Sequence, residues 1–175
     1  MKKKKAFTVI EVLIAFSIFV IVMGILFPFF ISSYKSFNNT AIKSELQDDA
    51  EKAMKSLSKI AMEAKKVSSI GDRDIDKSSQ VYIIEGINIK TIEFLSGDDE
   101  INKFELDKEL LYKVSPTGDK TNIGKNIDYI EVSPLQGFTF DKSQGIKIVL
   151  NMKKKDIEYT MNNILYFRNK ASERK

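Results

Sequence analysis

Glu11 is a charged residue inside an apolar stretch. From Phe7 to Ile31 the only other polar side chains are those of Thr8 and Ser17. A carboxylate inside a membrane helix is energetically costly, so a cationic group that neutralises Glu11 would offset the cost. The alternative is that Glu11 lies one turn inside the membrane interface and extends to water.

The sequence contains neither histidine nor cysteine. This absence excludes the Ser-His triad, the Cys-His nucleophile and the usual structural zinc sites. Acidic and tyrosine residues are present, but their spacing is not typical of an active site. We therefore predict no catalytic residue, no cofactor and no metal ligand, and we expect a protein that is not an enzyme.

One acidic cluster has the spacing of a calcium loop. Asp72, Asp74 and Asp76 alternate as at the start of an EF-hand. However, Lys77 stands where that loop needs glycine, and Ile83 stands where it needs a bidentate glutamate. The pattern does not predict a metal site.

Two further charged runs are typical of solvated turns. Asp98, Asp99 and Glu100 are expected at the tip of a hairpin. Lys153 to Lys155 have no interleaved aromatic residues, which disfavours nucleic acid as a partner. The net charge also disfavours nucleic acid as a partner. Lys2 to Lys5 supply four of the 28 basic residues, and the rest of the chain carries 24 charges of each sign.

The apolar stretch is long enough to cross a membrane. At about 1.5 Å per residue, residues 7–31 span roughly 37 Å, against about 30 Å for the hydrocarbon core. Lys2 to Lys5 precede it and mixed charges follow it, which places the N-terminus in the cytoplasm and the rest of the chain outside. A secretory signal peptide is the alternative, but its apolar region usually has about 7 to 15 residues, and this one continues through Phe30.

The segment from residue 32 to residue 67 predicts an amphipathic helix that continues the membrane helix as one rod. Charged residues such as Asp48, Asp49, Glu51 and Lys55 lie between its apolar positions. The apolar residues recur every three or four positions and are Ile42, Leu46, Ala50, Ala53, Leu57, Ile60, Ala64 and Val67.

Residues 68–175 predict an antiparallel β domain. Ser68 to Ser79 have the composition of a loop, Ile127 to Val132 fit a strand or a short helix, and residues 153–156 fit a hairpin connection. The predicted strands are Val81–Glu85, Ile89–Leu95, Lys103–Leu106, Leu110–Val114, Phe138–Phe140, Ile146–Met152 and Ile157–Phe167. The expected fold class is α+β, a long N-terminal helix packed on a C-terminal antiparallel sheet.

The N-terminal residues resemble the prepilin leader of type IV pilins and type II secretion pseudopilins. The shared features are the basic run Lys2 to Lys5, the small residue Ala6, then Phe7, and Glu11 within an apolar helix. In that family a prepilin peptidase cuts before the phenylalanine on the cytoplasmic side and N-methylates the new terminus. The resemblance implies cleavage between Ala6 and Phe7, after residues 1–6, and N-methylation of Phe7. The family usually has glycine where this chain has Ala6, which bears on the efficiency of processing.

The same resemblance assigns functions to Glu11 and Pro28. The new amine on Phe7 would neutralise Glu11 of an adjacent subunit during filament assembly. Pilins of this family commonly carry a proline at the depth of Pro28, and a proline inside a helix removes a backbone hydrogen bond and kinks the rod.

A second resemblance covers more of the chain and concerns the subtype. Leu46 to Ala50, Leu57, Ile60 and Ala64, with the closing residues Tyr166 to Asn169, are similar to J-type minor pseudopilins and W-type minor pilins. Proteins of those families have the pilin fold and lie near the filament tip.

The resemblances imply a minor pilin or pseudopilin, a structural subunit of a type IV pilus-like filament. The implied partners are prepilin peptidase, the other pilins or pseudopilins, an inner assembly platform protein, and membrane lipid before assembly. The subunit would then reside in the filament or at the cell surface. Adhesion, motility, secretion and DNA uptake (competence) remain open as the purpose of the filament. The rival interpretation is a single-pass membrane-anchored binding protein outside the cell, whose helix stays uncleaved.

Overall fold

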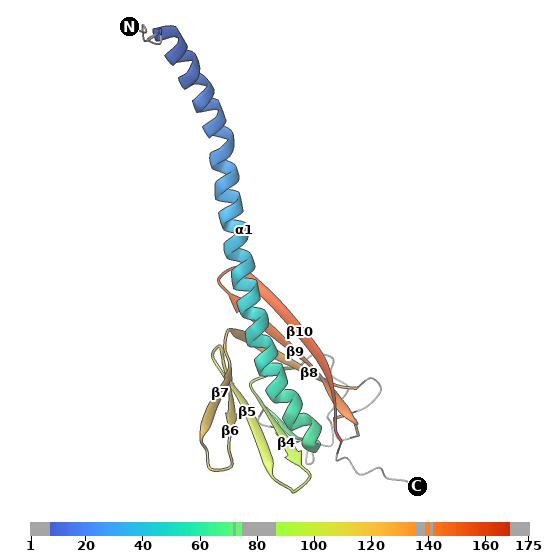
Figure 1. Cartoon of the computed structure of the whole chain (residues 1–175). Coiled ribbons are helices and arrows are strands. Elements are labelled where there is room, and N and C mark those ends of the chain that lie inside the picture. The colour runs from blue at the N-terminus through green and yellow to red at the C-terminus, as the bar shows by residue number, and fades with distance from the viewer. Residues whose placement is uncertain (1–7, 72, 75–86, 136–138, 141, 169–175) are drawn as a thin grey trace, which may run out of the picture. The chain divides into compact units, whose positions relative to one another are not determined.

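The computed structural model describes residues 8–71, 73–74, 87–135, 139–140 and 142–168. One helix, α1 (Val9–Glu63), is followed in these residues by ten strands (Figure 1). The chain divides into two compact units, residues 1–41 and residues 42–175. The prediction that the apolar and amphipathic segments form one continuous helix is confirmed.

Helix α1 ends at Glu63 rather than at the predicted Val67. Ser68 lies in a strand, so the predicted loop does not begin at this residue. Ala64, Val67 and Ile70 are buried, but they belong to strand β1 (Ala64–Ile70). The pairing register of β1 shifts between Ala64 and Lys66 and again between Val67 and Ser69. Each bulge adds one residue, so buried side chains recur at every third position instead of every second. This spacing imitates a helix, which explains the wrong prediction.

The strands form two antiparallel sheets, not the single sheet that was predicted. The first contains β1, β2 (Arg73–Asp74), β4 (Thr91–Ser96), β5 (Ile101–Asp107), β6 (Leu110–Val114) and β7 (Lys120–Gly124), in the order β2-β1-β4-β5-β6-β7. The second contains β3 (Ile87–Ile89), β8 (Ile127–Pro134), β9 (Gly145–Lys154) and β10 (Ile157–Tyr166), in the order β10-β9-β8-β3.

Most predicted strands are present with small shifts. The predicted strand Ile89–Leu95 is split at Lys90, because β3 pairs in one sheet and β4 in the other. Ile127–Val132 is a strand, β8, whereas β7 was not predicted. Thr139 and Phe140 lie outside any strand, and the expected strand Val81–Glu85 lies outside the described residues.

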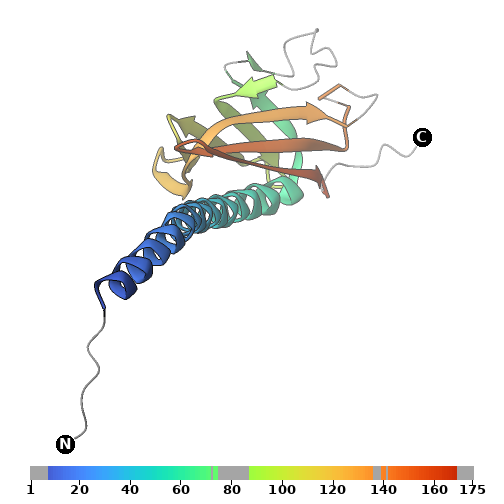
Figure 2. The same cartoon turned by 90° about the horizontal axis from the view of Figure 1, so that it is seen from above.

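One hydrophobic core joins residues 42–63 of α1 to both sheets (Figure 2). Leu46 and Leu57 of the helix are almost completely buried. The ring of Phe94 on β4 meets Phe104 at 6.0 Å and Phe167 at 6.5 Å between centroids, both edge to face. Because Phe167 follows β10, this aromatic cluster links the two sheets. The predicted α+β class, a helix packed on antiparallel strands, is confirmed.

A polar network also ties α1 to the strands. Asp49, expected on the exposed face, is buried and accepts a hydrogen bond of 2.8 Å from Asn126 Nδ2. One helical turn earlier, Glu45 accepts from Lys154 Nζ at 2.6 Å and from Lys125 Nζ at 3.3 Å. These hydrogen bonds lower the pKa of Glu45, and the bond from Lys154 contributes most.

Candidate processing and assembly site

The first turn of α1 is closed by a reciprocal cap between Thr8 and Glu11. Glu11 Oε2 accepts the backbone N–H and the hydroxyl of Thr8, each at 2.8 Å. In return the backbone N–H of Glu11 donates to Thr8 Oγ1 at 3.3 Å. This is a capping box, in which the first and fourth residues satisfy each other's free backbone donors. Thr8 was not predicted as a functional residue, although a threonine three residues before a glutamate is the signal for this motif.

The cap leaves part of the Glu11 carboxylate available. A carboxylate offers about four lone-pair sites on two oxygens. Both contacts from Thr8 fall on Oε2, and no described residue donates to Oε1. Glu11 is exposed, so a cation from outside the chain can reach Oε1 without breaking the cap.

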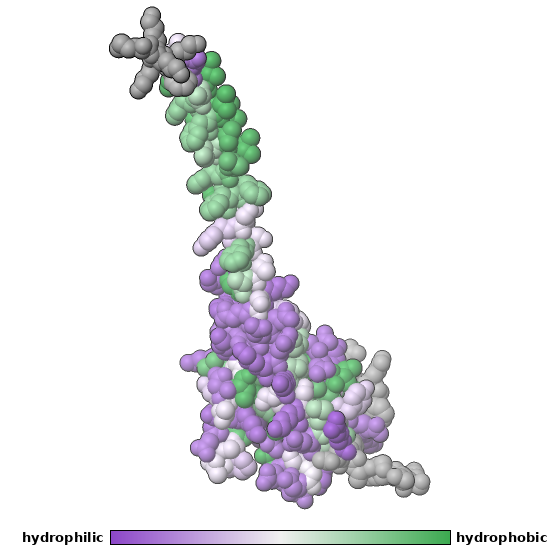
Figure 3. Space-filling view, viewed as in Figure 1, coloured by the Kyte–Doolittle hydropathy of each residue, from purple (hydrophilic) through white to green (hydrophobic). Residues whose placement is uncertain are grey.

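The helix beyond the cap exposes apolar side chains on all sides. No residue in its most hydrophobic part is buried, and α1 is the one described helix long and apolar enough to cross a membrane. Val9 is 79% exposed and Phe29 71%, and the green surface in Figure 3 follows this segment. The hydroxyl of Ser17 is bonded to the carbonyl of Leu13 at 2.9 Å, so it can enter lipid with its donor satisfied. An unburied apolar helix of this kind must be covered by lipid or by other helices.

Pro28 lies inside α1, and the kink expected there stays a prediction. A proline has no N–H, so the carbonyl of Gly24, four residues earlier, lacks its helical partner. Gly24 itself has no neighbouring atom that a Cβ would meet within 4 Å. The cleavage and methylation positions, Ala6 and Phe7, lie outside the described residues.

The acidic run at residues 98–100 forms a solvated hairpin tip, as predicted. It joins β4 to β5, and its residues are exposed. Asp99 has a positive φ of 65° and accepts from Lys65 Nζ at 2.8 Å, which lowers the pKa of Asp99. Among the described residues there is no cluster of three acidic side chains suited to a metal ion. Of the calcium-like motif, Asp72, Asp76, Lys77 and Ile83 lie outside the described residues.

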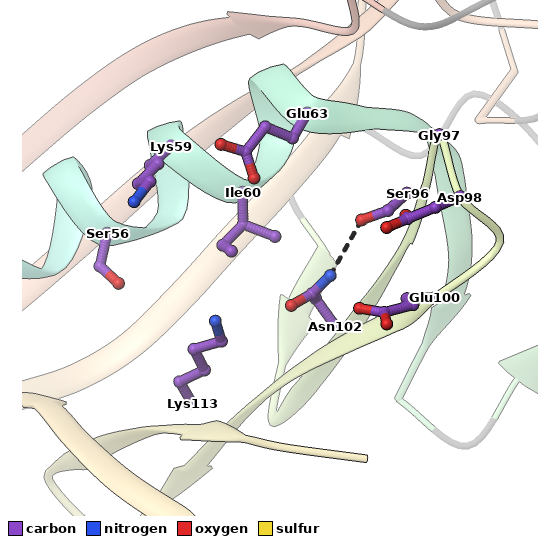
Figure 4. Close-up of a pocket in the computed structure, with 10 residues that line it drawn as sticks. All are labelled: Ser56, Lys59, Ile60, Glu63, Ser96, Gly97, Asp98, Glu100, Asn102 and Lys113. Atoms are coloured by element: carbon purple, nitrogen blue, oxygen red, sulfur yellow. Dashed lines mark hydrogen bonds between the residues drawn. The ribbon is translucent and has the colours of Figure 1, made fainter.

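A polar groove separates this hairpin from the last turns of α1 (Figure 4). Lys59 and Glu63 line it from the helix, and Lys113 lines it from β6. Asn102 donates to Ser96 at 2.9 Å on the hairpin side. The lining carries both charge signs and no pairing of a nucleophile with a base, so its geometry does not suggest catalysis.

Comparison with known proteins agrees with the N-terminal features. Residues 1–27 match the family model of the prokaryotic N-terminal methylation motif. Searches of curated proteins and of solved structures found no match to the chain. The matched residues include the basic leader, the capped first turn and most of the apolar helix, and they support a type IV pilin-like prepilin that is processed by prepilin peptidase.

Proposed function

We propose that this chain is a minor pilin or pseudopilin that is cleaved between Ala6 and Phe7, N-methylated on Phe7, and assembled into a type IV pilus-like filament. The observation that carries this proposal is the methylation motif at residues 1–27, which coincides with an apolar helix exposed on all sides. The subunit is structural rather than catalytic. Its partners are prepilin peptidase, the other pilins or pseudopilins, and the inner assembly platform protein.

The mechanism uses the two oxygens of Glu11 separately. Cleavage after Ala6 leaves a cationic amine on Phe7, one residue before the cap. Within one subunit Glu11 Oε2 holds the first turn through Thr8. Glu11 Oε1 accepts the Phe7 amine of an adjacent subunit, so the charge is neutralised as the helices leave lipid for the apolar filament core. Van der Waals contact between the helices supplies selectivity, because lipid is equally apolar.

The variant Glu11→Gln tests this mechanism, because glutamine at this position preserves a capping box through its one oxygen and removes the charge and the second acceptor oxygen. We expect unchanged membrane insertion and leader removal, with a large loss of protein from sheared filaments. Thr8→Ala is the matched control, since it removes the cap hydroxyl and keeps the charge. It should assemble far better than Glu11→Gln. Equal amounts of Glu11→Gln and native protein in the filament fraction would show that Glu11 is only an interfacial residue.

The second candidate function is a membrane-anchored binding protein with an uncleaved helix, and the groove in Figure 4 is the feature that favours it. The two functions differ at the N-terminus of the mature protein. A tether keeps the lysine leader, whereas a filament subunit begins at Phe7.

A further inference from the structure

The apolar surface of α1 continues beyond the membrane segment along one side of the helix. Residues 32–41 are all exposed, and seven of these ten are serine, threonine, asparagine or lysine. The other three are Tyr34, Phe37 and Ala41, which follow Phe30 at successive spacings of four, three and four residues. Tyr34 is 68% exposed and Phe37 75%. Because residues three and four apart share one side of a helix, these side chains form a single stripe.

The same spacing runs back through the whole apolar segment, in two series of every seventh residue. The first series is Val9, Phe16, Met23, Phe30 and Phe37, and the second is Leu13, Val20, Phe27, Tyr34 and Ala41. We call these ten residues the heptad seam. An apolar heptad repeat is the pattern by which one helix packs along another. Almost every residue of the membrane segment is apolar, so the three seam positions beyond it carry the evidence for a helical partner.

Neither the hydrocarbon of the membrane nor the rest of the chain covers the outer end of the heptad seam. Residues 7–31 already exceed the length needed to cross the hydrocarbon core, and Phe37 lies about 9 Å beyond Ile31 along the helix. The hydrophobic core of residues 42–175 includes neither Tyr34 nor Phe37. Figure 3 shows the green surface giving way to white and purple beyond the membrane segment. An exposed aromatic stripe in this polar stretch needs a partner outside the hydrocarbon, and its spacing indicates a helix.

We propose that α1 pairs through the heptad seam with α1 of a second copy of this chain, as a parallel dimer in the membrane. Both copies insert in the same orientation, so the two-fold axis runs along the membrane normal. Each seam residue then faces its own counterpart, including Phe30, Tyr34 and Phe37. Contacts between aromatic rings stabilise such a pair beyond the area that they bury.

A second copy fits the heptad seam better than an unrelated helix does. The partner must present an apolar face that extends equally far beyond the hydrocarbon, and a second copy inserted in the same way does so. Glu11 and Lys35 fall outside the seam, so pairing in register opposes no like charges. The contact is isologous and closes at two subunits. It goes beyond the proposed filament function, because it forms in the membrane without leader removal and leaves Glu11 free for an adjacent subunit.

The absence of cysteine from the chain permits a direct test by disulfide cross-linking. Ala41→Cys places one thiol on the heptad seam and keeps every aromatic side chain. Asn39→Cys is the matched control, because residues two apart do not share a side of the helix. Each full-length chain is expressed in cells without a prepilin peptidase, and the membranes are oxidised mildly and run on a non-reducing gel. We expect a dimer from Ala41→Cys, and also from Phe37→Cys, with several-fold less from Asn39→Cys.

Two neighbouring phenylalanines test whether the seam side chains hold the dimer together. Phe29 is 71% exposed and Phe30 69%, but only Phe30 belongs to the heptad seam. In the Ala41→Cys chain, Phe30→Ala should lower the cross-linked fraction several-fold, whereas Phe29→Ala should leave it almost unchanged. Equal losses from the two substitutions would overturn the proposal, because they would reflect the hydrophobicity of the helix and not its seam.

The cross-linking yields alone can also overturn the proposal. Equal dimer from Ala41→Cys and Asn39→Cys would indicate random collisions in the membrane. Absence of dimer from both Ala41→Cys and Phe37→Cys would mean that Tyr34 and Phe37 contact lipid headgroups or a different pilin. The proposed filament function would stand in either case, since it is read from the N-terminus of the mature protein.

Discussion

At the scale of single residues, the N-terminal segment combines a structural cap with a basic leader sequence. Thr8 and Glu11 fix the start of α1 through one carboxylate oxygen and leave the other accessible. The residues that prepilin peptidase would act on, Ala6 and Phe7, come immediately before this cap. On the proposed function, we expect processing to depend on the size of the residue before the cut and assembly to depend on the charge after it.

The first prediction concerns the residue before the cut. Ala6→Leu should leave the leader attached, because a bulky side chain does not fit a pocket that accepts glycine or alanine. Ala6→Gly is the matched control and should be cleaved at least as completely as the native chain. Coexpression with a prepilin peptidase followed by intact-mass measurement distinguishes the products. Removal of six residues from Ala6→Leu would refute the size constraint.

At the scale of elements, the docking of α1 on the strands depends on polar residues as well as on the apolar stripe. Asp49 is buried with one hydrogen bond from Asn126, and Glu45 is held by two lysines. Lys154 belongs to β9, and Asn126 lies between β7 and β8. The network therefore fixes the helix against both sheets.

The second prediction concerns the buried carboxylate. Asp49→Ala should lower the free energy of unfolding by about 1 to 3 kcal/mol, because it leaves the half-buried Asn126 amide without its acceptor. Asp48→Ala, at an exposed neighbouring position, should change it by no more than about 0.5 kcal/mol. Urea unfolding of the full chain in micelles, followed by circular dichroism, measures both. Equal effects of the two variants would mean that the Asp49 bond does not stabilise the fold.

The third prediction concerns pH. The pKa of Glu45 is lowered in the folded chain, chiefly by Lys154, so its stabilising effect is complete above its unfolded pKa and is lost as pH falls through the folded pKa. Glu45→Gln should therefore be less stable than the native chain at pH 7, and the difference should disappear well below pH 4.5, the ordinary value. Glu51→Gln is the control and should change the stability at pH 7 far less than Glu45→Gln, because Glu51 is bonded to the uncharged Gln47. A difference for Glu45→Gln that is independent of pH would exclude an electrostatic origin.

The sequence predicted the elements whose signals are local and missed those that depend on distant partners. The strand Leu110–Val114 was predicted with its observed bounds, because clear turn residues follow it. Strand β7 was missed because it has a single large apolar side chain, Ile123. Asp49 was assigned to the exposed face because its partner Asn126 is 77 positions away in the sequence. The Thr8 cap is a local signal that could have been found.

At the scale of the whole molecule, the two compact units have opposite surface chemistry. Residues 1–41 include the apolar exposed helix, whereas residues 42–175 contain the hydrophobic core and both sheets. Because this core includes no described residue before Ile42, the second unit has what it needs to fold by itself.

The fourth prediction is that residues 42–175 form a soluble folded domain without the membrane segment. Circular dichroism should show a mixed helix and strand spectrum, and thermal unfolding should be cooperative. An unfolded spectrum for this fragment would show that the apolar helix is required for the helix-on-sheet architecture.

The measurement that most directly tests the central claim is the mass and N-terminal sequence of the mature protein. The full chain is coexpressed with a prepilin peptidase, purified from membranes and analysed by mass spectrometry and Edman degradation. We predict a chain that lacks residues 1–6 and begins with N-methylated Phe7. An intact lysine leader, under conditions in which a known prepilin is fully processed, would contradict the filament function and support the uncleaved anchor.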